Sequence, residues 1–221
     1  MRASQKRRNG GAAIAPLSTL LPDDIKASIG DIVRSFLLTS GRLNGTCVYR
    51  AVIADGVFKS LGLPARLITG GLMYRAGFHR ERDVIRFALP NNLGGYHPDG
   101  WLCGHVWHQL DGEIIDFSSG DWVAEAHDVA LNDLGSSDLG FVEWQVEPPE
   151  YIWQPARSLT SKWKAHGVPR LGDVWYCGWG SSRPPADCLS REARMGTATI
   201  PYVVNLIEET NLRERIADFR R

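Results

Sequence analysis

The sequence lacks long hydrophobic runs. No apolar stretch reaches the roughly 18 residues that a membrane-spanning helix needs, so we expect no membrane partner. Near the start, basic residues precede a short apolar stretch at residues 12–17. That stretch contains Pro16 and has no convincing small-residue cleavage site, which argues against a secretory signal peptide.

An excess of charge of either sign is also missing. Lys plus Arg and Asp plus Glu both total 25, so the net charge is zero. A neutral chain lacks the positive surface that binds a phosphate backbone, and we expect no nucleic-acid partner. One basic cluster lies in a Gly- and Ala-rich segment and consists of Arg2, Lys6, Arg7 and Arg8. We interpret residues 1–20 as a solvated, flexible tail rather than an anion-binding arm.

Cysteine is scarce. The chain of 221 residues has four, namely Cys47, Cys103, Cys177 and Cys188. Disulfide-stapled scaffolds are smaller and richer in cysteine, so the pattern favours the reducing cytoplasm and a fold that depends on its own core. No cofactor is expected.

The composition, 43% hydrophobic and 23% charged, is typical of a globular protein, and the length fits one domain or one domain with an elaborated second half. Pro22 followed by two acids predicts a helix start, and apolar residues then recur at helical spacing until Gly41. A second helix is expected from Thr46 as N-cap, with Cys47 in its first turn. Its apolar face consists of Ala51, Ala54, Phe58 and Leu61, and it ends at Gly62.

Strand signals follow. We expect strands over residues 65–74 and 83–89, and a hairpin of strands 105–110 and 113–117 around Asp111-Gly112, a favoured two-residue turn. Signals beyond Gly120 are weaker: a helix over 122–134, a strand over 141–146, no clear period over 147–190, and a helix from about 203 to 219.

Cys47 is the first candidate for chemistry. A thiol is a useful nucleophile only as the thiolate, and the dipole at a helix start favours negative charge. The alternative is a buried structural cysteine, since cysteine is among the most buried residue types. Position alone leaves these two interpretations balanced.

The hairpin supplies a partner. With a two-residue loop, Trp107 faces Asp116, and His105 lies diagonally from Asp116 on the same sheet face. His108 points to the other face. The register therefore selects His105 as the imidazole that Asp116 can orient, and an oriented imidazole near a thiol is the arrangement of cysteine acyl-transfer enzymes. A loop longer or shorter by one residue would reverse the choice.

These segments resemble the transglutaminase-like superfamily, which shares the papain-like fold. The similarity lies in residues 45–51 (GTCVYRA), residues 61–66 (LGLPAR) with Gly70, the strand 105–107 (HVW) and the pair Ile115-Asp116, in the family's order Cys, His, Asp. Val106 stands where the family usually has Ala, and the interval from His to Asp is compact. The matching segments span residues 45–118, about a third of the chain.

The resemblance implies an α+β papain-like core over residues 21–120, with residues 121–221 as a C-terminal elaboration of the same domain. It implies Cys47 as nucleophile, His105 as general base and Asp116 as the residue that orients it. The activity implied is acyl transfer from a peptide, protein or small amide through a thioester, to water or to an amine. The backbone N–H of Cys47, and Asn44 nearby, are candidate oxyanion donors.

Two alternative functions remain. The same fold without turnover would be a binding or scaffold module. Cys103, His105, His108 and His97 suggest a zinc site, although His105 and His108 point to opposite faces of a strand and no Cys-x-x-Cys pair is present. A group of aromatic residues could line a substrate groove but fits core packing better: Trp153, Trp163, Trp175, Tyr176 and Trp179. Arg66 is expected to support its strand rather than to act in catalysis.

Overall fold

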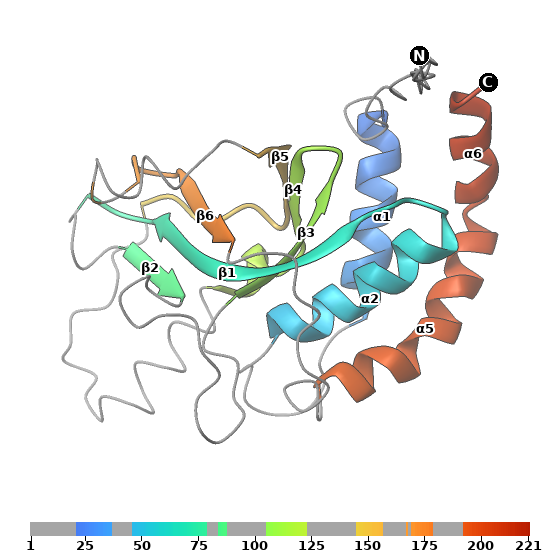
Figure 1. Cartoon of the computed structure of the whole chain (residues 1–221), viewed down its shortest axis with the longest axis horizontal. Helices are drawn as coiled ribbons and strands as arrows, with labels where there is room; N and C mark the ends of the chain where they lie inside the picture. The colour runs from blue at the N-terminus through green and yellow to red at the C-terminus, as the bar shows by residue number, and fades with distance from the viewer. Residues whose placement is uncertain are drawn as a thin grey trace, which may run out of the picture.

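The computed structural model describes residues 21–36, 46–78, 84–87, 105–122, 145–156, 167, 169–178 and 192–221. Over these residues the fold is α+β, as predicted, with a curled antiparallel sheet beside a group of helices (Figure 1). The helices are α1 (Asp23–Ser35), α2 (Thr46–Ser60), α5 (Glu192–Glu209) and α6 (Leu212–Phe219), with a short 3-10 turn, η3 (Ser119–Asp121). None of these helices is both long and apolar enough to cross a membrane.

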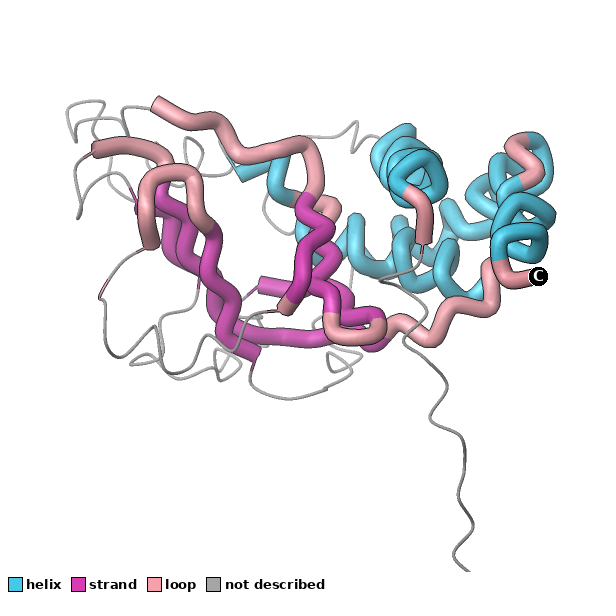
Figure 2. The backbone as a smooth tube through the Cα atoms, turned by 90° about the horizontal axis from the view of Figure 1, so that it is seen from above, coloured by secondary structure: helices cyan, strands magenta, loops and turns pink. Residues whose placement is uncertain are grey.

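The described strands form one six-stranded antiparallel sheet. They are β1 (Arg66–Arg75), β2 (Val84–Phe87), β3 (His105–Leu110), β4 (Glu113–Asp116), β5 (Ile152–Pro155) and β6 (Val174–Gly178). The order is β2-β1-β3-β4-β5, and β6 also pairs with β1. Strand β1 is long and bent (Figure 1), and seen from above the strands lie on one side and most of the helices on the other (Figure 2). The curl brings Tyr176 of β6 within hydrogen-bond distance of Asp116 on β4, although β1 and β3 separate the two strands in the pairing order.

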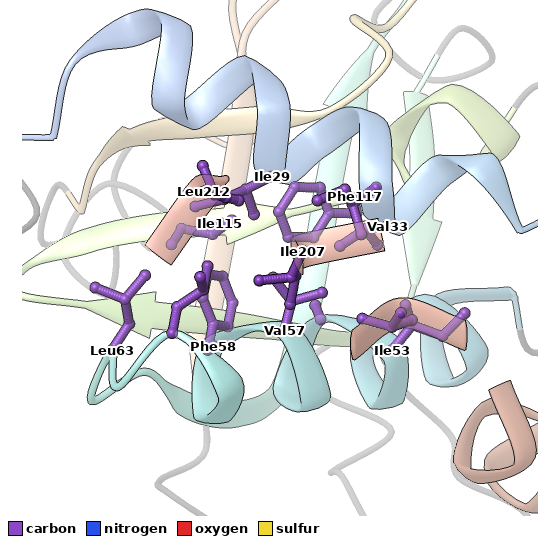
Figure 3. Close-up of a cluster of buried hydrophobic side chains, with 14 of the residues drawn as sticks. Ile29, Val33, Ile53, Val57, Phe58, Leu63, Ile115, Phe117, Ile207 and Leu212 are labelled. Atoms are coloured by element: carbon purple, nitrogen blue, oxygen red, sulfur yellow. The ribbon is translucent and has the colours of Figure 1, made fainter. Parts of the chain in front are cut away.

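Helix α2 lies in the middle of the main core. Its Ile53, Val57 and Phe58 meet Ile29 and Val33 of α1, and Ile207, Leu212, Ile115 and Phe117 close the cluster (Figure 3). Helices α2 and α5 approach closely because glycines face side chains across the contact. A Cβ on Gly56 would lie 3.0 Å from Ile200, and one on Gly196 would lie 2.9 Å from Val52.

The predicted apolar face of α2 is buried, but so are most other sides of this helix. Helix α5, which belongs to the second half of the chain, covers a side of α2 that was not predicted to be buried. The β6 strand joins the first half in the same way, through its pairing with β1. Helix α5 therefore packs directly on the helix that carries Cys47, and β6 packs on the strand that follows it.

Some predicted boundaries were wrong. Helix α1 ends at Ser35, and Phe36 is extended, whereas the helix was expected to continue to Gly41. The helix expected over 203–219 is two helices, because Asn211 adopts a left-handed φ of 51° between α5 and α6. Strands β5 and β6 were not predicted at all. Gln145 and Val146 lie in a bend rather than in the strand expected over 141–146. The predicted tail at 1–20 and most of the helix expected over 122–134 lie outside the described residues.

Candidate functional site

Cys47 occupies the first turn of α2, as predicted. The helix begins at Thr46, one residue earlier than expected, so Thr46 is the first helical residue rather than the residue before it. Cys47 is 9% exposed and packs in a small apolar cluster with Val48, Ala51 and Val106 of β3. The start of α2 is thus fixed against the start of the strand that carries His105.

The hairpin has the predicted register. Leu110 pairs with Glu113 and His108 with Ile115. Asp111 and Gly112 both have positive φ, 46° and 87°, as the favoured two-residue turn requires. The pairing depends on this turn, because one more or one fewer residue would move each side chain of a strand to the opposite face.

His105 and Asp116 meet on one face of this hairpin. The Nε2 atom of His105 lies 2.5 Å from Oδ2 of Asp116, and both side chains are at most 1% exposed. His108 lies on the other face, where its ring packs edge-on against Phe58 of α2 with 5.1 Å between centroids. The structure therefore brings Asp116 to His105 and not to His108, as the register predicted.

Asp116 is held by donors on both of its oxygens. Oδ1 accepts from the backbone N–H and the hydroxyl of Ser118, at 2.9 and 2.7 Å. Oδ2, which faces His105, also accepts from the hydroxyl of Tyr176 at 2.9 Å. Burial alone would raise the pKa of Asp116, but the charge of His105 and the hydrogen bonds from His105 and Ser118 hold it below its usual value. Asp116 is therefore ionised at neutral pH.

Two neighbours act on the charge of His105. Burial lowers its pKa, but the Asp116 carboxylate outweighs burial, and hydrogen bonding and charge interaction with Cys47 raise the pKa further, to about 10. His108 shows the contrasting case, because burial there prevails and lowers the pKa to about 4. An imidazolium beside a thiol is suited to stabilise a thiolate.

Aromatic rings surround His105. The ring of Trp107 stacks at 6.1 Å between centroids, and those of Trp122 and Tyr176 lie at 5.9 and 6.3 Å. These contacts fix the plane of the imidazole and keep water from it. Trp122 and Tyr176 were not predicted as site residues. Tyr176 belongs to the aromatic group of the sequence analysis, but no local pattern separated it from the tryptophans around it.

The remaining candidates have mixed outcomes. Asn44, Cys103, His97, Trp163 and Trp179 lie outside the described residues. Trp175 and Tyr176 are buried in one hydrophobic cluster, and Trp153 is half-buried against the other. All three therefore agree with the prediction that the aromatic group packs in the core. Within the described ranges no group of three or more His, Cys, Asp or Glu side chains is placed to hold a metal ion. The zinc alternative, which needs Cys103 or His97, stays a prediction.

Two arginines of the matching segments have no direct contact with the site. Arg66 is exposed and lies 3.4 Å from Gln109 of β3, which agrees with a supporting role. Arg50 is buried: Nη1 donates to the carbonyls of Val33 and Phe36 at 3.1 and 2.8 Å, and Nε lies 3.3 Å from Asp121. Arg50 thereby ties the end of α1 to the helix of Cys47 and to the turn that follows Asp116.

Comparisons with known proteins add little. No protein-family model matches the chain, and no curated protein matches it. One solved structure, the crystal structure of a genomics target, is 16% identical and has a TM-score of 0.48, covering 89% of this chain and 81% of that one. That similarity is too weak to assign a fold family or a function.

Proposed function

We propose that this chain is a cysteine-dependent acyl-transfer enzyme of transglutaminase-like, papain-like type, an amide or peptide hydrolase or an amine transferase. The observation that supports the proposal best is the buried pair of His105 and the Asp116 carboxylate, next to Val106, against which the thiol at the start of α2 packs. A structural histidine needs a hydrogen-bond partner for its N–H, but it does not need an ionised carboxylate and a thiol together.

In the proposed first step, the Cys47 thiolate attacks the carbonyl carbon of an amide, and the C–S bond forms as the carbonyl oxygen becomes an oxyanion. Backbone N–H groups in the first turn of α2, including that of Cys47, are candidate donors to this oxygen. The imidazolium of His105 then donates its proton to the amine as the C–N bond breaks. A thioester on Cys47 and a neutral imidazole remain.

In the second step, His105 takes a proton from water or from an acceptor amine, which attacks the thioester. The tetrahedral intermediate collapses, the C–S bond breaks, and the thiolate–imidazolium pair returns. Asp116 remains ionised throughout and stabilises the imidazolium whenever it forms. Hydrolysis and amine transfer differ only in the acceptor.

Alkylation by iodoacetamide tests the thiolate. Purified protein is treated over a range of pH, and the rate at each cysteine is read by peptide mapping. We expect Cys47 to react faster near neutral pH than Cys177, although Cys177 on β6 is the more exposed of the two thiols. Cys177 is thus an internal comparison within the same sample. A Cys47 rate no higher than that of an ordinary thiol would favour the binding-module alternative.

An activated ester tests turnover. With p-nitrophenyl acetate, we expect a burst of nitrophenol and one acetyl group on Cys47, detected by mass spectrometry of the quenched protein. Cys47→Ala should abolish the burst, and Cys177→Ala should leave it unchanged. A burst of equal size in Cys47→Ala would contradict the proposed nucleophile.

A further inference from the structure

We propose that Tyr176 is a positioning residue of this site, and that its hydroxyl fixes the carboxylate of Asp116 so that Oδ2 points at His105. The inference rests on the proposed function and extends it to a residue in the second half of the chain. Tyr176 lies on β6, which reaches the site only through its pairing with β1, where Tyr176 is opposite Leu72.

The two carboxylate oxygens of Asp116 accept hydrogen bonds from different donors. Oδ1 is held by the N–H and hydroxyl of Ser118, two residues along the chain. Oδ2 accepts from Tyr176 at 2.9 Å while lying 2.5 Å from Nε2 of His105. With donors at both ends, the carboxylate cannot rotate about its Cβ–Cγ bond without breaking hydrogen bonds. Tyr176 is the donor that acts on the same oxygen as the imidazole.

Packing explains the ring of Tyr176 but not its hydroxyl. The ring contacts Trp107 at 5.0 Å between centroids and His105 at 6.3 Å, contacts that a phenylalanine would also make. Burial first, then the charge of Asp116, raise the pKa of Tyr176 well above its usual value. The hydroxyl therefore keeps its proton and remains a donor at every pH at which the site would operate. Burying a hydroxyl costs free energy unless it makes a hydrogen bond, and the bond to Asp116 offsets that cost.

The substitution Tyr176→Phe keeps the ring and removes only the donor. We expect the alkylation rate of Cys47 at neutral pH to fall about tenfold, the factor that loss of one hydrogen bond to a charged group corresponds to. We also expect the acid side of the rate profile to move to higher pH, because an ionised Asp116 with one donor fewer is protonated more readily. The ring ¹⁵N resonances of His105 should change as well.

Tyr74→Phe is the matched control. Tyr74 is also a buried tyrosine of this sheet, on β1, and its hydroxyl donates to the backbone carbonyl of Val146 at 2.8 Å, which bears no formal charge. Both variants lose one buried tyrosine hydroxyl, so a general effect on stability appears in both. Only Tyr176→Phe should alter the Cys47 rate profile and the His105 resonances.

Ser118→Ala gives a graded comparison. It removes one donor from Oδ1 but leaves the backbone N–H of Ser118 in place, so its effect on Cys47 should be smaller than that of Tyr176→Phe. Equal behaviour of Tyr176→Phe and Tyr74→Phe in both readouts would overturn the positioning role, as would a loss in Ser118→Ala as large as that in Tyr176→Phe. If wild-type Cys47 reacts no faster than Cys177, the proposed function fails, while the His105 resonances still decide the role of Tyr176.

Discussion

Replacing Asp116 by asparagine should remove the positive charge of His105 at neutral pH. Two histidines of β3 supply the magnitude. Both are fully buried, but the pKa of His105, beside Asp116, is raised to about 10, whereas that of His108 is lowered to about 4. The rise from 6.5 to about 10 corresponds to about 5 kcal/mol in favour of the imidazolium. In Asp116→Asn burial is no longer opposed by a carboxylate, and we expect the pKa of His105 to fall below 6.5.

The assay is a pH titration of the ring ¹⁵N resonances of His105, with alkylation of Cys47 followed in parallel. Wild-type His105 should remain an imidazolium until the pH approaches about 10, and in Asp116→Asn it should be neutral at pH 7. The Cys47 rate should fall roughly a hundredfold or more, because a neutral imidazole does not stabilise the thiolate. Asp24→Asn, which removes a surface carboxylate paired with Arg215, is the control for loss of one charge.

Stability gives an independent check on the same reasoning. The folded-state pKa of His105 lies above its unfolded value of 6.5, so its contribution is fully present below pH 6.5 and is lost as pH rises toward about 10. Urea unfolding of wild type should show that decline, and Asp116→Asn should not. An imidazolium that persists at pH 8 in Asp116→Asn would refute the assignment of Asp116 as the source of the charge.

Four further substitutions test the fold around the site by urea unfolding. Because the pKa of His108 is lowered to about 4, the unfolded chain binds one more proton than the folded chain between pH 6.5 and about 4. The free energy of unfolding should therefore decrease by about 3 kcal/mol as the pH falls through that interval. The decrease should be absent in His108→Phe. Arg50→Ala should cost about 3–5 kcal/mol, since it leaves two carbonyls and a carboxylate without their buried partner. Gly70→Ala should cost about 3 kcal/mol, because the new Cβ would lie 2.1 Å from a backbone oxygen. Gly62→Ala meets nothing within 4 Å, and its left-handed φ of 65° should cost only about 1 kcal/mol.

Local signals explain what the sequence could predict. Gly62 and Pro64 mark the end of α2, and Asp111-Gly112 fixes the register that turns His105 and not His108 toward Asp116. Each of these signals acts within a few residues of the feature it determines. The facing of His105 and Asp116 is confirmed, whereas the catalytic roles of Cys47, His105 and Asp116 stay predictions.

Contacts between distant segments explain what was missed. Strand β6 forms by pairing with β1, about a hundred residues earlier in the chain, and its short segment has no alternation of its own. For the same reason nothing near Tyr176 indicates that its hydroxyl meets Asp116. The break between α5 and α6 was missed because asparagine, although common at helix ends, also occurs inside helices and marks a break less strongly than glycine or proline does.

Helix α2 packs against α1, α5 and strand β3, and most of its side chains are buried. A segment enclosed on so many sides releases its amides only when its neighbours separate, so we expect their deuterium exchange to follow global unfolding. Cys47 then lies at the start of a helix that its neighbours in the described structure enclose. When a ligand binds, we expect the residues around the sulfur to move rather than the backbone of α2, because that backbone is held by its neighbours.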